Sequence, residues 1–249
     1  MAQYDDYGAL YTRLKNRPIP IMQNRYASTA MDDLSGLRVL DAACGTGFYS
    51  QMMARQGAAE VIGIDVSSGM IENAKKELPV QLEDGPIRYF VGDFDQADLL
   101  QNLGLDRLRG TFDMVFAAWL LNYAADWQRL TRMLNNIFDA LKPGGKLIAL
   151  TPNPFLLQEH GPEMTTEEGR IGDRWQVTET YAYGFRVHMM VNASPSVEFD
   201  SYVLYVSEYE KAAAAAGFPC LSWEVVSIKW IICGHQRKWL TSVDIAIRG

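Results

Sequence analysis

The chain has 249 residues, of which 23 are basic and 30 are acidic, so its formal charge at pH 7 is −7. This length suits one large α/β domain, and the negative balance argues against nucleic acid or anionic membranes as partners, since no basic stripe offsets it. The longest apolar stretch, 114–121, is shorter than the roughly 20 residues of a membrane span. The N-terminus is acidic and the three cysteines have no metal-binding spacing. We therefore expect a cytoplasmic protein without a metal centre.

Residues 1–35 carry several tyrosines and are predicted to be helical, forming a lid. Beyond them, apolar runs alternate with helical segments, a pattern typical of a parallel sheet with helices on both faces. Ser67 and Asp126 are predicted to cap two of the helices. The predicted helices include 48–56 and 127–142, and the predicted strands are 38–41, 61–65, 87–91, 113–118 and 146–151.

The alternation of strand and helix stops after Thr151. A long insertion in a compact domain is usually functional, and we interpret this one as a substrate cap. It contains strand-like runs at 176–181, 185–191 and 199–206, and it is followed by a predicted helix at 207–216 and strands near 222–229 and 240–247.

The predicted fold class is α/β, with a Rossmann-like, mostly parallel sheet of seven strands and helices on both faces. An N-terminal helical lid and a substrate cap inserted after the fifth strand complete it. We expect 1–249 to be one domain, divided into the lid (1–35), the cofactor-binding core (36–151), the cap (152–206) and the completion of the sheet (207–249).

A glycine turn follows the first predicted strand, where residues 37–47 read L-R-V-L-D-A-A-C-G-T-G. Gly45 and Gly47 lack a Cβ, so they permit the positive φ and the close approach that a ligand over a strand-to-helix turn requires. Asp65 ends the next apolar run, 20 residues after Gly45, where a carboxylate can accept both hydroxyls of a ribose. This spacing predicts a nucleoside site.

These motifs resemble those of the class I S-adenosylmethionine-dependent methyltransferases. The matching strings are V-L-D-A-A-C-G-T-G, G-I-D-V-S-S-G-M-I, V-G-D-F, F-D-M-V-F-A-A and L-K-P-G-G-K-L-I, all within 39–150. Within this family the chain is most similar to toxoflavin-type azapteridine N-methyltransferases, through A-A-W-L-L-N-Y-A at 117–124, Gln3-Tyr4-Asp5 and the P-S-x-x-F segment at 195–199. One departure is Ala43, where the family usually has glycine.

The resemblance implies S-adenosyl-L-methionine as cofactor and S-adenosyl-L-homocysteine as product. In this family Asp65 would hold the ribose, Asp93 would accept the adenine amino group, and the backbone of Ala117 would hold the ammonium. The remaining predicted cofactor contacts are Val66, Met70 and Phe94 around the adenine, Ala43, Gly45 and Gly47 in the turn, and Tyr4 and Tyr123 near the sulfur.

The resemblance also implies a small, heteroaromatic, natural-product-like substrate, with nitrogen as the favoured acceptor. Transfer from a sulfonium requires mainly that the nucleophile be held in line, and a base is needed only for an acceptor that carries a proton. His188 and Tyr11 are the candidates for a catalytic group. The predicted substrate contacts are Tyr11, Trp119, Asn122, Asn153 and His188.

Several alternatives remain open from the sequence. O- or C-methylation of a small aromatic metabolite would use the same cofactor residues. A nicotinamide-dependent oxidoreductase would also use Gly45, Gly47 and Asp65, although Ser50 replaces the third glycine of that fingerprint. A non-catalytic module that binds S-adenosylmethionine is the third alternative. The number of subunits is not predicted.

Overall fold

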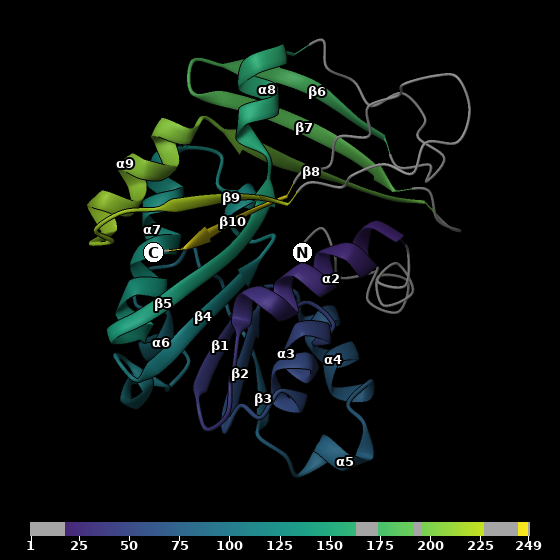
Figure 1. The fold of residues 1–249 in the computed structure, drawn as a ribbon, viewed down its shortest axis with the longest axis vertical. Coiled ribbons are helices and arrows are strands. Elements are labelled where there is room, and N and C mark those ends of the chain that lie inside the picture. The colour runs from purple at the N-terminus through teal and green to yellow at the C-terminus, as the bar shows by residue number, and fades with distance from the viewer. Residues whose placement is uncertain (1–17, 163–173, 192–195, 227–243, 249) are drawn as a thin grey trace.

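The computed structural model describes residues 18–162, 174–191, 196–226 and 244–248 (Figure 1). Tyr4 and Tyr11 lie outside the described residues, as does Pro195 of the P-S-x-x-F segment. The predictions made for them therefore stay predictions.

A central sheet has the strand order β3-β2-β1-β4-β5-β10-β9. Strands β1 to β5 are parallel, whereas β10 is antiparallel to both β5 and β9. The predicted Rossmann-like fold with five parallel strands is confirmed. The strands are β1 (Arg38–Ala42), β2 (Glu60–Asp65), β3 (Ile87–Val91), β4 (Phe112–Ala118), β5 (Leu141–Pro152), β9 (Ser222–Val226) and β10 (Asp244–Arg248).

Helices cover both faces of this sheet, because each central strand is apolar on both sides. In β1, for example, Val39 packs with the helices of one face and Leu40 with those of the other. The first face carries α2 (Pro18–Met31), α3 (Phe48–Arg55) and α4 (Ser68–Lys76), and the second carries α6 (Leu99–Asn102), α7 (Trp127–Ala140) and α9 (Val206–Ala216). The short helices are α5 (Val80–Glu83), η1 (Asp106–Leu108) and η2 (Leu121–Tyr123).

Two predicted helix caps are confirmed. Ser67 Oγ accepts a hydrogen bond from the Met70 amide, and Asp126 Oδ1 accepts one from the Arg129 amide. The helix predicted at 127–142 corresponds to α7, which ends at Ala140, so its predicted end was wrong. Pro143 disfavours a helical conformation in the residue before it, and the pairing with β4 skips 142–145 before the regular part of β5 begins.

A second, three-stranded antiparallel sheet follows the core and lies at the top of Figure 1. Its strands are β6 (Arg174–Tyr181), β7 (Gly184–Val191) and β8 (Val197–Leu204), which confirms the three predicted strand-like runs to within two residues. Helix α8 (Pro154–His160) packs on one face through Leu157, which contacts Phe185, Val187 and Val203. Strand β8 also packs against η2, so the inserted sheet touches the core.

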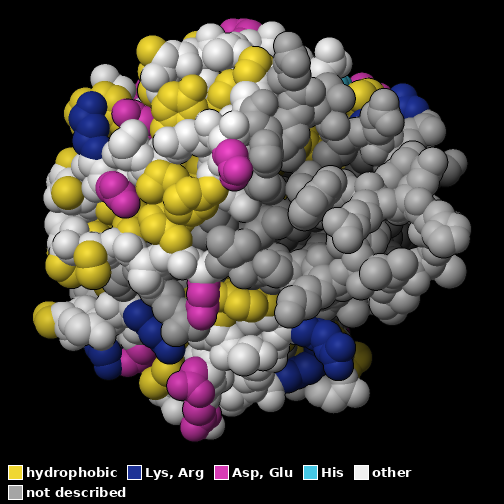
Figure 2. Space-filling model, turned by 45° about the horizontal axis from the view of Figure 1, so that its top comes forward, with side chains coloured by type: hydrophobic (Ala, Val, Ile, Leu, Met, Phe, Trp, Pro, Cys, Tyr) yellow, Lys and Arg dark blue, Asp and Glu magenta, His cyan; other side chains and the backbone are white. Residues whose placement is uncertain are grey.

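The described surface has a mixed character. On the face shown in Figure 2, lysine and arginine side chains form separate groups among acidic and apolar ones. Within the described residues, no helix is long and apolar enough to cross a membrane.

Candidate functional site

A cavity of about 270 Å³ lies at the carboxyl edge of the parallel strands. This volume is just below the range of roughly 300–1,000 Å³ that is usual for small-molecule sites. Its walls come from the segments after β1, β2, β3 and β4 and from the start of α7. Among the predicted site residues, the cavity brings together Ala43, Gly45, Asp65, Val66, Met70, Asp93, Phe94, Trp119 and Tyr123.

Asp65 joins the glycine turn to the start of α4. One carboxylate oxygen accepts a hydrogen bond from the Gly45 amide at 2.8 Å, and the other accepts one from the Ser67 amide at 2.9 Å. The side chain is nearly buried, yet it lines the cavity. Since an ionised carboxylate can accept about four hydrogen bonds, it can also bind hydroxyl groups of a ligand.

The two glycines of the turn have different roles. Gly45 has φ +53°, and a Cβ added there would meet no atom within 4 Å, so its open side is available to a ligand. Gly47 has φ +78°, and an added Cβ would lie 2.2 Å from the Tyr89 hydroxyl oxygen. Gly47 does not line the cavity, so the structure places it as a packing residue behind the turn.

Ala43 stands in a left-handed conformation, with φ +61°. This conformation costs an L-residue roughly 1–2 kcal/mol. Glycine avoids this cost, but its greater conformational freedom in the unfolded chain offsets part of the gain in stability. We expect Ala43→Gly to raise the free energy of unfolding by about 0.5–1 kcal/mol, measured by denaturant titration. Ala42→Gly, in the adjacent strand, is the matched control and should lower the free energy of unfolding. Equal losses in both variants would contradict this explanation.

Ser50, which departs from the dinucleotide fingerprint, belongs to a buried polar group beneath the turn. Its hydroxyl donates to Asp41 Oδ2 at 2.5 Å, and both residues are fully buried. Cys44 lines the cavity floor nearby, and burial raises the pKa of its thiol well above the usual range, with the charges of Asp41 and Asp65 adding to the effect. Cys44 is therefore a neutral wall residue at physiological pH.

The loop after β3 is fastened to α7. Asp93 lines the cavity, and its Oδ1 accepts a hydrogen bond from the Asp95 amide at 2.9 Å, which holds the turn in place. Asn136 of α7 donates to the backbone carbonyls of Phe94 and Gln96, at 2.8 and 2.7 Å, and accepts from the Leu99 amide. These contacts fix Asp93 and Phe94 at one end of the cavity.

The segment after β4 forms the opposite end. Trp119 lines the cavity with φ +63°, an uncommon backbone conformation for a bulky residue that is often found at functional sites. Tyr123 also lines the cavity, whereas Ala117 is fully buried and its neighbour Ala118 takes the lining position. Asn122 is buried in η2 and does not line the cavity.

Two predicted substrate residues lie away from the cavity lining. Asn153 caps α8, where its Oδ1 accepts a hydrogen bond from the Phe155 amide at 2.9 Å. His188 lies on β7 of the inserted sheet, with Nδ1 2.8 Å from Asp200 Oδ1. The hydrogen bond with His188, together with that from Arg186, lowers the pKa of Asp200.

Sequence reasoning missed several residues of the cavity wall. Ala118 and Leu120 lie next to predicted residues, so the A-A-W-L string at 117–120 could have identified them. Arg129 and Met133 reach the cavity from α7, and no motif marks them.

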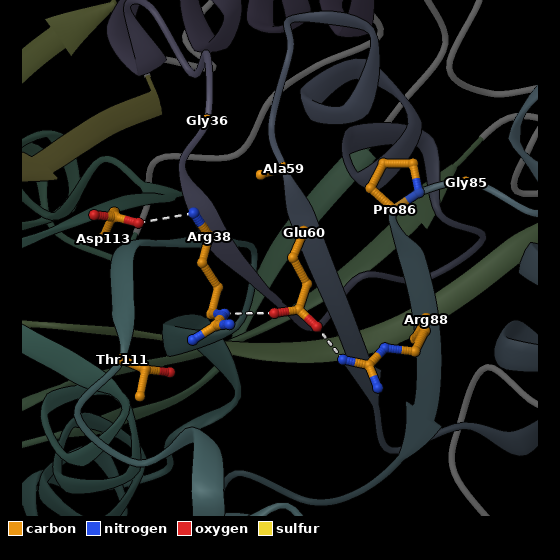
Figure 3. Close-up of a pocket in the computed structure, with 9 residues that line it drawn as sticks. All are labelled: Gly36, Arg38, Ala59, Glu60, Gly85, Pro86, Arg88, Thr111 and Asp113. Atoms are coloured by element: carbon orange, nitrogen blue, oxygen red, sulfur yellow. Dashed lines mark hydrogen bonds and ion pairs between the residues drawn. The ribbon is translucent and has the colours of Figure 1, made fainter.

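A second, larger cavity of about 490 Å³ lies at the amino edge of the same strands. Figure 3 shows Glu60 between two guanidinium groups, those of Arg38 and Arg88, with an ion pair on each side. Asp113 accepts a hydrogen bond from the Arg38 amide at 2.7 Å. None of the predicted site residues lines this cavity, and its charges neutralise one another, so its size does not make it the functional site.

Residues 39–145, which carry the glycine turn, Asp65 and the loop of Asp93, match the family model described as a methyltransferase domain. The residues of the predicted nucleoside site therefore lie in a segment that is similar to methyltransferase domains. Within the described residues, no group of three or more His, Cys, Asp or Glu side chains is arranged to hold a metal ion.

Curated relatives match parts of the chain. An uncharacterised protein of Haemophilus influenzae is 29% identical over 179 residues, which cover 69% of this chain and 61% of the relative. A magnesium-protoporphyrin O-methyltransferase of Rhodobacter capsulatus is 40% identical over 92 residues, which cover 37% of this chain and 36% of the relative. The chain thus spans less than two thirds of the length of either relative.

Solved structures share the fold over nearly the whole chain. The magnesium protoporphyrin IX methyltransferase of Synechocystis PCC 6803, solved with bound S-adenosylhomocysteine, has a TM-score of 0.60 and 16% identity, and the match covers 98% of this chain and 94% of that one. At this identity the likeness concerns the fold alone.

Proposed function

We propose that this protein transfers the methyl group of S-adenosylmethionine to a small molecule, with a ring nitrogen of a heteroaromatic compound as the favoured acceptor. The observation that carries the proposal is the junction of Gly45 and Asp65 at the cavity wall. It combines an open turn with a carboxylate suited to a ribose, and both residues lie in the segment that matches the methyltransferase family.

The residues that line the cavity include groups that suit the adenosyl part and the sulfonium of this cofactor. Asp65 offers oxygens for the ribose hydroxyls, Asp93 offers an acceptor for the adenine amino group, and Met70 supplies apolar surface. The aromatic rings of Trp119 and Tyr123 favour a sulfonium cation in their vicinity. S-Adenosylmethionine supplies the transferable methyl group, and these residues bind and orient it.

The proposed acceptor needs no general base. The two carboxylates that line the cavity, Asp65 and Asp93, are assigned to the cofactor, and no histidine, glutamate or lysine is among the described residues that line it. A ring nitrogen with a lone pair reacts without loss of a proton, so its transfer depends on positioning alone. The A-A-W-L-L-N-Y-A string at 117–124 supports the same acceptor through its resemblance to azapteridine N-methyltransferases.

O-Methylation is the second candidate, because one relative is named an O-methyltransferase. A phenolic acceptor must lose its proton, and His188 is then our candidate base. Its Nδ1 lies 2.8 Å from Asp200 Oδ1, a contact that would orient the ring, and its Nε2 lies 3.6 Å from Glu198 Oε2. The inserted sheet that carries His188 would act as a substrate cap in this proposal, and 1–35 as a lid.

A labelled-methyl screen tests the function. We would incubate the full chain with S-adenosylmethionine carrying a deuterated methyl group and with paired N-heteroaromatic and phenolic compounds. Mass spectrometry should detect one labelled methyl on an N-heteroaromatic compound, with S-adenosylhomocysteine as coproduct. Methylation of phenols only, lost in His188→Ala, would favour the second candidate instead.

Two outcomes would overturn the proposal. Tight binding of S-adenosylhomocysteine with no methyl transfer to any compound of a broad panel would indicate a non-catalytic module. Absence of S-adenosylmethionine binding, with saturable energy transfer from tryptophan to bound NADH, would indicate an oxidoreductase.

A further inference from the structure

Arg129 stands at the wall of the cofactor cavity in a fixed position. It lies in the first turn of α7, where its amide donates to the capping Asp126 Oδ1 at 2.8 Å. Its side-chain Nε donates to Asp95 Oδ2, also at 2.8 Å. Arg129 is one of the residues that line the cavity, and its backbone amide and its Nε are both held by hydrogen bonds, which restrict the position of its guanidinium group.

Asp95 binds a second arginine that does not reach the cavity. Arg132 Nε donates to the other carboxylate oxygen, Oδ1, at 2.8 Å. The two arginines have similarly exposed side chains, 39% and 44%. They therefore share one partner, one helix and one type of ion pair, and they differ in that only Arg129 lines the cavity.

The terminal amino groups of the Arg129 guanidinium are available as hydrogen-bond donors, because the ion pair with Asp95 uses only Nε. Among the described residues, the only side-chain partner of Arg129 is Asp95, through Nε. A guanidinium carries five N–H donors, so four remain. Asp93 lines the same cavity and can accept hydrogen bonds. It lies two residues before Asp95, in the loop after β3. The cavity wall thus offers an acceptor and a charged donor that are both hydrogen-bonded to Asp95.

That pair matches the edge of adenine. The exocyclic amino group of adenine is a donor, and each of the two ring nitrogens that flank it, N1 and N7, is an acceptor. We infer that Arg129 is a positioning residue for the cofactor, and that a terminal N–H of its guanidinium donates to one of these ring nitrogens while Asp93 accepts from the amino group. This inference rests on the proposed function, since it requires an adenosyl cofactor in this cavity.

Calorimetric titration of the full chain with S-adenosylhomocysteine tests the inference without relying on turnover. Arg129→Ala should raise the dissociation constant by about 10-fold or more, the loss expected for a charge-assisted hydrogen bond. Arg132→Ala, the matched control, should change it less than about twofold, because an exposed ion pair alone contributes little. Melting temperatures of both variants should fall equally, which would show that loss of the Asp95 pair is common to them.

The 1-deaza and 7-deaza analogues of S-adenosylhomocysteine identify the acceptor atom. For the analogue that lacks the bonded nitrogen, wild type and Arg129→Ala should bind with nearly equal affinity, because the same hydrogen bond is missing from both. For the other analogue the 10-fold difference should persist.

Two results would overturn the inference while leaving the proposed function intact. The first is an equal effect of Arg129→Ala and Arg132→Ala on binding. The second is a full loss in Arg129→Ala with both deaza analogues, which would show that Arg129 acts through neither ring nitrogen. Failure of the wild-type protein to bind S-adenosylhomocysteine would instead overturn the proposed function, and the inference with it.

Discussion

Replacing Gly47 with alanine should lower the free energy of unfolding by roughly 2–5 kcal/mol, the sum of a left-handed alanine and an overpacked contact. The added methyl group would lie 2.2 Å from the Tyr89 hydroxyl oxygen and 2.8 Å from the ring carbon that bears it. Urea titration followed by tryptophan fluorescence measures the loss.

Two further variants separate the causes of that loss. Gly45→Ala has a similar positive φ but open space around the new methyl group, so it should cost only about 1–2 kcal/mol of stability while weakening cofactor binding more than Gly47→Ala does. In a Tyr89→Phe background, Gly47→Ala should regain part of its loss, because the closest atom is gone. An unchanged loss in that background would show that Tyr89 is not the obstacle.

Replacing Asp65 with alanine should weaken binding of S-adenosylhomocysteine by about 10- to 150-fold, which corresponds to roughly 1.5–3 kcal/mol for hydrogen bonds to a charged group. Asp65 also accepts the Gly45 and Ser67 amides, so the variant should lose stability as well. Isothermal titration at a temperature well below the melting point measures the affinity of the folded fraction.

Asp113→Asn is the matched control for Asp65. Asp113 likewise accepts a hydrogen bond from a backbone amide, that of Arg38, but at the opposite edge of the sheet. Its substitution should leave the affinity for S-adenosylhomocysteine unchanged. Should Asp65→Ala bind as tightly as the wild type, the ribose lies elsewhere.

The core of the fold could be predicted because its signals are local. The five parallel strands contain short, largely apolar runs, and each predicted range overlaps the observed strand. Pro143 marked the region where α7 ends but not the residue, since a helix end depends on pairing with β4 as well as on the proline.

The cofactor end of the site was predictable for a different reason. Gly45 and Asp65 are 20 residues apart in the chain, but parallel pairing of β1 and β2 forces their ends together. Any sequence with this strand–turn–helix–strand order must bring such residues to one edge, so spacing alone was sufficient.

The rest of the site depends on packing between distant segments. Arg129 and Met133 reach the cavity because α7 packs on the sheet and on the loop after β3, and nothing in their own neighbourhood marks them. Ala117 was predicted from the resemblance to hold the cofactor through its backbone, and the residue of this segment that lines the cavity is its neighbour Ala118. The role of Gly47 depends on Tyr89, 42 residues later, which no local pattern reveals.

The hydrogen bond between the Gly45 amide and Asp65 has a kinetic consequence. Because the turn and the acid are already locked together in the free protein, an arriving nucleoside does not have to order them, and little chain entropy is lost on contact. The association rate constant should then be close to that of diffusional encounter. Differences in affinity among nucleoside analogues should appear almost wholly in their dissociation rate constants.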